Sequence, residues 1–266
     1  MAKRQRSWNY DKYQKYIKAG RGQGDGLAYL PWITIHDFSS RGIVSRVYGQ
    51  KAKRVHHFLS RNELYYFYLL EWSNNVLDIR EQYPLMDIDL AVDVADKAEI
   101  KYPRDNISGF PYVLTCDFMV TTQNGLKART IKSSSELKNI RVLEKLEIER
   151  RYWKELDIDW RLVTEKDISL QKARNIEWLH TAATLPEWLS SRMLKEYLLR
   201  ELGINASILQ TVSSFDDEFR LPLGSGLLLF KHLLWTRDII CDMGREIQLA
   251  GQCSQVVDVR ERTWSV

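Results

Sequence analysis

The stretch CDFMVTTQNGLKARTIKSS, residues 116–134, predicts the β-hairpin that decides the fold. CDFMV and LKARTIK have the composition of short strands, and QNG at 123–125 supplies the turn between them. Asn-Gly between two β-prone runs favours a tight hairpin, because both residues tolerate positive φ. Two charged residues interrupt this ribbon: Asp117 lies inside the first strand, and Lys132 ends the second. The hairpin brings them to the same end of a predicted sheet.

The segments around the hairpin predict an α/β core over residues 60–168. Ser60 precedes the run LYYFYLLEW, and Glu63 follows Ser60 by three positions, as in a helix with a capping box. VLDIREQYPL predicts a strand that stops near Pro84, LAVDVADKAEI a short helix, and DWRLVTEKDI a last strand. Apolar residues at Ile140, Leu143, Leu146 and Ile148 predict a long amphipathic helix after the hairpin. The stripe of Leu143, Leu146 and Trp153 is expected to lie in the core. The order α-β-α-β-β-α-β indicates a mixed sheet flanked by helices.

The amino-terminal region is basic and rich in aromatic residues. Residues 1–61 contain thirteen Lys or Arg against three Asp or Glu, a net charge of +10, which leaves −6 for the rest of the chain. DKYQKYIKA predicts a short helix, GRGQGDG a mobile or DNA-tracking loop, and YLPWITI, GIVSRVYG and RVHHFLS predict strands. Such a region suits a nucleic-acid phosphate backbone. A solvated basic surface is the alternative that the charge alone leaves open.

A polar interval at Ser169–Lys172 predicts a boundary between two domains, 1–168 and 169–266. In the second domain IEWLHTA, SSRMLKEYLLREL, NASILQTVSSF and SGLLLFKHLLW predict helices, and DIICDMG and QVVDVRE predict paired short strands. Helices followed by a β-hairpin are the outline of a winged helix, a module that docks on nucleic acid or protein.

Composition excludes several classes of protein. No run approaches 18 apolar residues, so no membrane span is expected, and the basic start MAKRQR has no apolar run behind it that would make a signal peptide. The three cysteines have no CxxC spacing, which argues against a structural zinc site and favours reduced thiols in a cytoplasm.

The charged residues of the hairpin suggest metal-dependent phosphodiester chemistry. Thr130 and Lys132 share one face of the return strand, and Ile131 points to the other. Mg²⁺ prefers oxygen ligands, polarises a phosphate and lowers the pKa of a bound water, and a nearby lysine stabilises the developing charge. The alternatives are a structural Asp–Lys pair and, for Glu63, a simple role in helix capping.

Longer phrases of the sequence resemble the TnsA family, the endonuclease subunits of heteromeric cut-and-paste transposases. They are GRGQGDGLAYLPWITIHDF, KRVHHFLSRNELYYFYLLEWSNNVLDIREQYPL, TCDFMV, LEKLEIERRYWKELDIDWRLVTEKDI and NIEWLH, spread over residues 20–180. The resemblance implies a restriction-endonuclease-like fold with Glu63, Asp117 and Lys132 as catalytic residues. It also implies cleavage at the 5′ ends of a mobile element, a DDE-type transposase partner (TnsB-like), and an AAA+ regulator (TnsC-like) that docks on the carboxy-terminal domain.

The sequence departs from the family pattern at one position. Two residues before the catalytic lysine this fold usually has Gln or Glu, and here it has Thr130, a shorter and neutral ligand that binds metal through water or not at all. We expect Mg²⁺, with Mn²⁺ as a substitute and two ions per site, to be held by Asp117, Glu63 and the backbone carbonyl of Ile131, and Thr130 puts one of the two ions in question.

Further residues are predicted to support the site or to contact DNA. Asp78 and Arg80 alternate along the strand before the hairpin, where they could orient Glu63 or a metal-bound water or form a structural ion pair. Gln82 resembles a glutamine near the site of related nucleases. The expected DNA contacts, with plain packing as the alternative for the two histidines, are Arg21, Lys51, Lys53, Arg54, His56 and His57.

Two other functions remain compatible with the sequence. Thr130 favours a catalytically impaired scaffold that bridges transposase, regulator and DNA. A stand-alone restriction or repair nuclease of the same fold is the second alternative, and the neighbouring genes would distinguish it from a transposase subunit.

Overall fold

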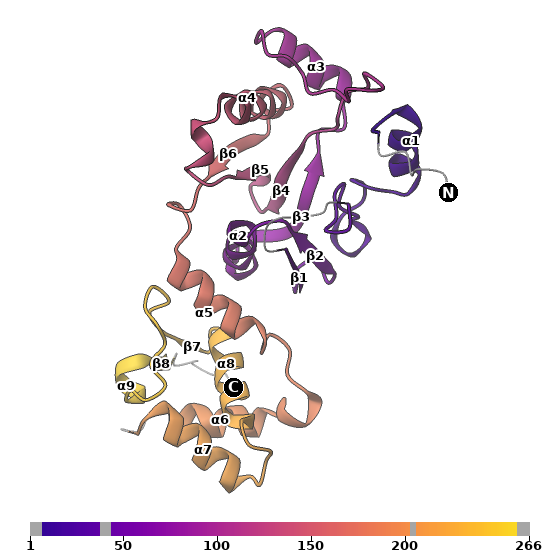
Figure 1. The fold of residues 1–266 in the computed structure, drawn as a ribbon. Helices are drawn as coiled ribbons and strands as arrows, with labels where there is room; N and C mark the ends of the chain where they lie inside the picture. Colours follow the sequence, from indigo (N-terminus) through magenta and orange to yellow (C-terminus); the bar gives the residue numbers. More distant parts are fainter. Residues whose placement is uncertain (1–6, 38–43, 203–205, 260–266) are drawn as a thin grey trace, which may run out of the picture. The chain divides into compact units, whose positions relative to one another are not determined.

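The predicted hairpin forms the middle of a four-stranded sheet in the computed structural model (Figure 1). Strands β4 (Thr115–Thr122) and β5 (Gly125–Ile131) pair antiparallel, and β3 (Val76–Pro84) pairs antiparallel with β4. Strand β6 (Asp159–Val163) joins β5 in parallel, which gives the order β3-β4-β5-β6. The prediction of a mixed sheet is therefore confirmed.

The structure describes residues 7–37, 44–202 and 206–259, and the chain divides into two compact units, Met1–Ile168 and Ser169–Val266. Besides the four-stranded sheet, the first unit contains α1 (Tyr10–Lys18), η1 (Gly26–Ala28), the paired strands β1 (Ser45–Tyr48) and β2 (Val55–Phe58), α2 (Arg61–Trp72), α3 (Ile88–Asp96), η2 (Glu136–Lys138) and α4 (Ile140–Glu155). From residue 60 onward the order of the main elements is the one predicted.

The hairpin turn depends on glycine. Thr122 pairs with Gly125, so only two residues form the loop, and Gly125 lies at φ 100°. The Thr122 hydroxyl donates to the Gly125 carbonyl at 2.8 Å and closes the turn. Asn124 tolerates positive φ but does not adopt it, so a single glycine in this region suffices for the turn.

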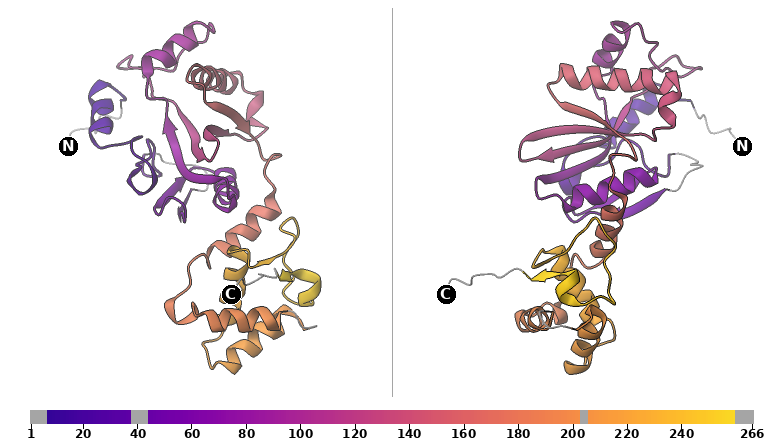
Figure 2. Two further views of the ribbon diagram at one scale, coloured as in Figure 1. Left: turned by 180° about the vertical axis from the view of Figure 1, so that it is seen from behind. Right: turned by 90° about the vertical axis from the view of Figure 1, so that its left-hand side faces the viewer.

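Helices cover both faces of the four-stranded sheet (Figure 2). On one face, Met119 and Ala128 pack in a core cluster with Ile148 of α4, and α3 contributes to the same cluster. On the other face, Phe118 contacts Phe58 and Tyr66, so β2 and α2 lie on that side. Neighbouring residues of β4 thus point to opposite layers, as strand alternation requires.

Two sequence expectations about the first unit are wrong: the strand at YLPWITI and the burial of Leu143. YLPWITI continues from η1 as an irregular segment of bends with one isolated bridge, Leu30 to Arg21, and its Tyr29 and Trp32 are buried. The preceding glycine loop packs against the sheet, because a Cβ on Gly22 would lie 2.4 Å from Pro84 Cγ. In α4, Leu146 and Trp153 are buried as predicted, but Leu143 is 41% exposed. The basic start, residues 1–6, lies outside the described residues.

The second unit is mainly helical. Its elements are α5 (Leu170–His180), η3 (Glu187–Leu189), α6 (Arg192–Glu201), α7 (Ile208–Glu218), α8 (Ser225–Trp235), β7 (Ile239–Ile240), α9 (Cys253–Val256) and β8 (Asp258–Val259). Strands β7 and β8 pair antiparallel, as expected, but each has only two residues. The winged helix stays a prediction.

Close packing of α7 on α8 organises this unit. A Cβ on Gly226 would lie 2.4 Å from the Val212 carbonyl oxygen, so only glycine allows the two helices to approach this closely. Buried Asp216 of α7 accepts hydrogen bonds from the backbone N–H groups of Gly224 and Gly226 at the start of α8. This carboxylate satisfies donors that a helix start leaves unpaired. Within the described residues, every helix is too short or too polar to cross a lipid bilayer.

Candidate active site

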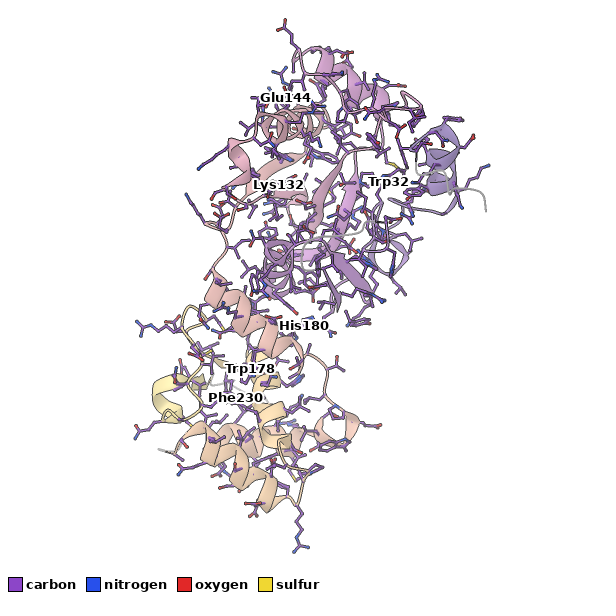
Figure 3. All side chains as sticks on the ribbon, viewed as in Figure 1. Trp32, Lys132, Glu144, Trp178, His180 and Phe230 are labelled. Carbon is purple, nitrogen blue, oxygen red and sulfur yellow. The ribbon has the colours of Figure 1, made fainter. Side chains whose placement is uncertain are left out.

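Glu63, Asp117 and Lys132, which are far apart in the sequence, meet at one end of the four-stranded sheet. Glu63 lies in the first turn of α2, Asp117 lies in β4, and Lys132 directly follows β5. Figure 3 labels Lys132 in this region. Lys132 Nζ lies 3.5 Å from Asp117 Oδ2, and the Gln82 amide lies between the Glu63 and Asp117 carboxylates. The structure thus brings together the three residues predicted from sequence to form a site.

The start of α2 holds Glu63 in place. The Ser60 hydroxyl accepts a hydrogen bond from Glu63 N, and the Glu63 carboxylate accepts from Ser60 Oγ at 2.8 Å and from Leu59 N at 3.0 Å. The cap therefore fixes the carboxylate as well as the helix. Burial, and next the charge of Asp117, raise the pKa of Glu63.

Asp117 and Lys132 are joined through the backbone of β5. Asp117 Oδ2 accepts a hydrogen bond from Ile131 N at 2.6 Å, and Lys132 Nζ donates to the Ile131 carbonyl at 3.0 Å. The charge of Asp117 raises the pKa of Lys132, against the opposing effect of burial. Asp117, the Lys132 ammonium and the backbone of Ile131 therefore contact one another at this end of the sheet.

Gln82 takes the position between the two acids. Its Nε2 donates to Glu63 Oε2 at 3.3 Å and to Asp117 Oδ1 at 3.4 Å, while its Oε1 accepts from the Thr115 hydroxyl. Its backbone lies at φ 49°, an uncommon conformation for a residue with a side chain. Left-handed backbone at such a position is a form of strain that concentrates at functional sites.

The Thr130 side chain contacts helix α4, at an acidic residue that sequence reasoning missed. The Thr130 hydroxyl donates to Glu149 Oε2 at 2.5 Å and accepts from Trp160 Nε1 at 3.2 Å. Glu149 lies in α4, and burial raises its pKa to about 8, with Asp117 and Lys132 also acting on it. Glu149 is three residues after buried Leu146 and four before buried Trp153. A glutamate on the apolar stripe of α4 was the sequence signal that could have identified it.

Two of the residues predicted to contact DNA are buried, and for them the prediction is wrong. Arg54 donates to Glu81 Oε1 at 2.8 Å and Oε2 at 2.6 Å, and to the Ile79 carbonyl at 3.0 Å. His56 Nδ1 lies 2.7 Å from Glu81 Oε2, and both of these side chains are fully buried. These groups hold β2 against β3 and cannot reach a DNA backbone. Plain packing was the correct alternative for His56.

The other four residues predicted to contact DNA keep that role as a prediction. Arg21 forms an ion pair with Asp37 at 2.7 Å, and Lys51 Nζ donates to the Val76 carbonyl at 2.6 Å. His57 is half-buried. Lys53 is the most exposed of the four, and its Nζ lies 3.4 Å from Gln50 Oε1.

Asp78 and Arg80 form the structural ion pair that was the alternative to a supporting role at the site. Their charged groups are 3.5 Å apart. Asp78 also accepts from Gly26 N at 3.2 Å, and Arg80 donates to the Thr121 hydroxyl. Among the described residues, no hydrogen bond or ion pair connects either of them to Glu63 or Asp117. Asp78 thus anchors the glycine loop to β3, and Arg80 connects β3 to β4.

A mixed sheet flanked by helices, with two buried acids, a lysine and a backbone carbonyl at one end, is consistent with a nuclease-type domain. Comparison with known proteins agrees: residues 73–165 match the family model described as TnsA-like endonuclease N terminal, and residues 167–243 match the one described as TnsA endonuclease C terminal. The chain is also 36% identical over 274 residues to the Transposon Tn7 transposition protein TnsA of Escherichia coli, an alignment that covers 98% of each chain. The chain belongs to the TnsA family. Asp117 and Lys132 lie inside the first matched segment, and Glu63 precedes it.

Proposed function

We propose that this chain is the metal-dependent DNA endonuclease subunit of a heteromeric transposase and that it hydrolyses the phosphodiester at the 5′ ends of a mobile element. Its membership of an endonuclease family supports the reaction class. The transposition protein that it resembles over nearly its whole length supports the biological setting. The observation that carries the proposal is the meeting of Glu63, Asp117 and Lys132 at one end of the sheet.

The residues at the site fit a hard divalent cation. Among the described residues, no three His, Cys, Asp or Glu side chains are grouped closely enough to form a metal site by themselves. Glu63 and Asp117 would therefore need a further oxygen ligand. We assign it to the carbonyl of Ile131, which accepts from Lys132 Nζ at 3.0 Å, while the same Nζ lies 3.5 Å from Asp117. Burial, and next the charge of Asp117, raise the pKa of Glu63, and a cation between the two carboxylates would offset both effects. Mg²⁺ or Mn²⁺ bound there would polarise the phosphate and lower the pKa of a water molecule.

Each of the other side chains has a separate task in this proposal. Lys132 is protonated at neutral pH and, fixed beside Asp117, donates to the phosphate oxygens as negative charge develops on them. Gln82 holds the two carboxylates in one orientation through its amide. Thr130 contributes no ligand in this arrangement, because its hydroxyl is engaged by Glu149 and Trp160.

The partners follow from the same proposal. Because the proposal limits this chain to the 5′ ends, the other strand is left to a second enzyme, which we assign to a DDE-type transposase. The AAA+ regulator would dock on the second unit, whose matched segment is separate from that of the nuclease domain. DNA is the substrate of the site in the first unit.

Strand-specific cleavage tests this function. Element-end DNA labelled on the 5′ strand is incubated with Mg²⁺ or Mn²⁺ and the partner transposase, using the wild type, Asp117→Asn and the matched control Asp159→Asn. Asp159 lies on β6 of the same sheet and pairs with Arg129 outside the site. We expect Asp117→Asn to abolish 5′-strand cleavage while the control and the binding of transposase are retained. Cleavage by Asp117→Asn would refute the assignment, an inactive wild type would favour the scaffold, and full activity without transposase would favour a stand-alone nuclease.

A further inference from the structure

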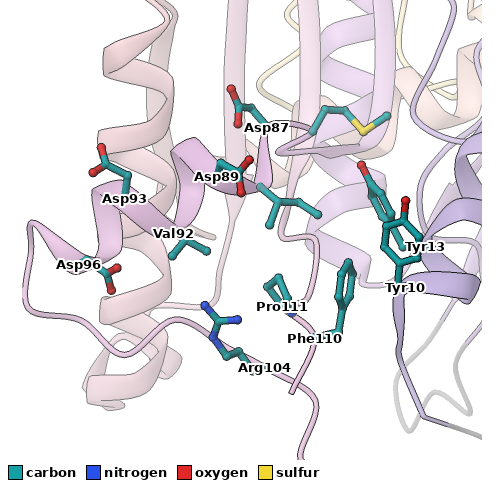
Figure 4. A pocket seen from close by; sticks show the side chains of 12 residues that line it. Tyr10, Tyr13, Asp87, Asp89, Val92, Asp93, Asp96, Arg104, Phe110 and Pro111 are labelled. Carbon is teal, nitrogen blue, oxygen red and sulfur yellow. The ribbon is translucent and has the colours of Figure 1, made fainter. Parts of the chain in front are cut away.

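A groove lies between α1, α3 and the loop before β4, outside the candidate active site (Figure 4). Its volume is about 690 Å³, within the range of ordinary ligand sites. Figure 4 shows aspartates along α3 on one side and the rings of Tyr10, Tyr13 and Phe110 on the other. The groove therefore has an acidic side and an aromatic side.

The acidic side consists of four exposed aspartates. Asp89, Asp93 and Asp96 follow one another at spacings of four and three residues along α3, and Asp87 caps the helix by accepting from Leu90 N. Of the four, Asp93 already pairs with Lys97. No described Lys or Arg forms an ion pair with the other three. Arg104 is the one cationic residue that lines the groove.

The aromatic side offers apolar surface that the fold leaves uncovered. Tyr10 is 58% exposed, and its ring contacts those of Tyr13 and Phe110 at centroid distances of 6.4 and 5.9 Å. Burial, and then negative charges that include Asp89 and Asp87, raise the pKa of Tyr13, so the acids and the rings act on the same space. A ligand for this groove needs both apolar and positively charged groups.

The acidic and aromatic sides of the groove exclude DNA and a metal ion, which are the two other ligands of a DNA-cleaving enzyme. Negative charge along α3 repels a phosphate backbone, so DNA does not bind here. The aspartates are not grouped as a metal site, since no three acidic, His or Cys side chains of the described residues can share an ion. A polypeptide with basic side chains around an aliphatic or aromatic one matches both sides of the groove.

We propose that this groove docks a basic, apolar-containing segment of another protein of the transposition machinery. The proposal rests on the proposed function for the identity of the partner, and on charge complementarity for the chemistry of the segment. In such a complex the apolar side chain packs on Tyr10 and Phe110, and Lys or Arg side chains pair with Asp87, Asp89 and Asp96.

Overlapping fluorescent peptides that span the other proteins of the same element provide the probes, with fluorescence anisotropy of the full chain as the measurement. The test variant is Asp87→Asn/Asp89→Asn/Asp96→Asn, in which Asn keeps the helix cap and the Asp93–Lys97 pair remains. The matched control, Asp157→Asn/Asp217→Asn/Glu218→Gln, removes the same amount of charge from exposed positions elsewhere. Tyr10→Ala tests the apolar contact.

At least one net-basic peptide should bind the wild type and the control equally and should bind the test variant about tenfold more weakly, because three exposed ion pairs each contribute a few-fold. Tyr10→Ala should also weaken binding of the peptide. The proposal is overturned if no peptide binds, if the test variant and the control bind alike, or if peptides bind only after residues 1–6 (MAKRQR) are removed, which would make the chain's own segment the occupant. Asp117→Asn should bind the peptide normally, so the docking proposal and the nuclease proposal fail separately.

Discussion

The substitution Glu81→Gln should destabilise the first unit far more than the same substitution of an exposed glutamate whose pKa is equally low. Glu81 is fully buried, where burial alone would raise its pKa, but hydrogen bonds and charge from His56 and Arg54 outweigh that effect and lower it from 4.5 to about 2. A carboxyl group with this difference between the unfolded and folded chain contributes about 3 kcal/mol at pH 7. A second argument agrees: Glu81→Gln leaves Arg54 buried without a counter-ion, which costs about 3 to 5 kcal/mol.

Glu147 provides the matched control. Arg150 and Arg151 lower its pKa from 4.5 to about 2 as well, but its side chain is 32% exposed, and water screens these ion pairs. Glu147→Gln should therefore cost less than about 1 kcal/mol. Hydrogen exchange of the amides in β3 and β4 measures the free energy of opening of the first unit without contribution from the second.

The same interaction predicts a dependence on pH. Because the pKa of Glu81 is lower in the fold than in the unfolded chain, its contribution is complete above pH 4.5 and is lost as pH falls from about 4.5 towards about 2. Protection of β3 in Glu81→Gln should therefore converge on that of the wild type in acid. Two results would refute the reasoning from burial. One is an equal loss of protection in Glu81→Gln and Glu147→Gln at pH 7, and the other is a difference between Glu81→Gln and the wild type that persists at pH 2.

Two further predictions concern Gln82 and Gly226. Gln82→Leu removes the amide between the carboxylates of Glu63 and Asp117. We expect cleavage to require about ten- to a hundredfold more Mn²⁺, while hydrogen exchange of β3 changes little. An unaltered Mn²⁺ titration would show that the amide does not orient the two carboxylates. Gly226→Ala places a methyl group 2.4 Å from the Val212 carbonyl, and the overpacking should destabilise the second unit by about 1 to 3 kcal/mol, less the gain of about 1 kcal/mol in helix propensity. Faster exchange in α7 and α8 is the expected result, and greater protection there would contradict it.

Local patterns were sufficient to predict most elements of the first unit, and the family resemblance was needed to join Glu63 to Asp117 and Lys132 in one candidate site. Asn-Gly between β-prone runs predicts the hairpin, and the hairpin alone places Asp117 and Lys132 at one end of the sheet. Ser60 and Glu63 act on one another across three residues, so their cap is a property of the local chain. Local patterns failed at YLPWITI. Burial of Tyr29 and Trp32 in an irregular segment outweighs its strand propensity.

The sequence by itself determined the order of strands and helices and the acidic and basic residues of the hairpin, because hydrophobic period, capping and turn chemistry act over a few neighbouring residues. Which charges are buried depends on tertiary contacts. Arg54 was predicted to contact DNA, but it forms a buried ion pair with Glu81 of β3. Glu149 of α4 contacts Thr130 of β5, which is 19 residues earlier in the chain. The groove on α3 arises in the same way, from α1 and a loop far along the chain. Burial and convergence depend on contacts between distant segments, and those contacts set both the pKa values and the surfaces on which function depends.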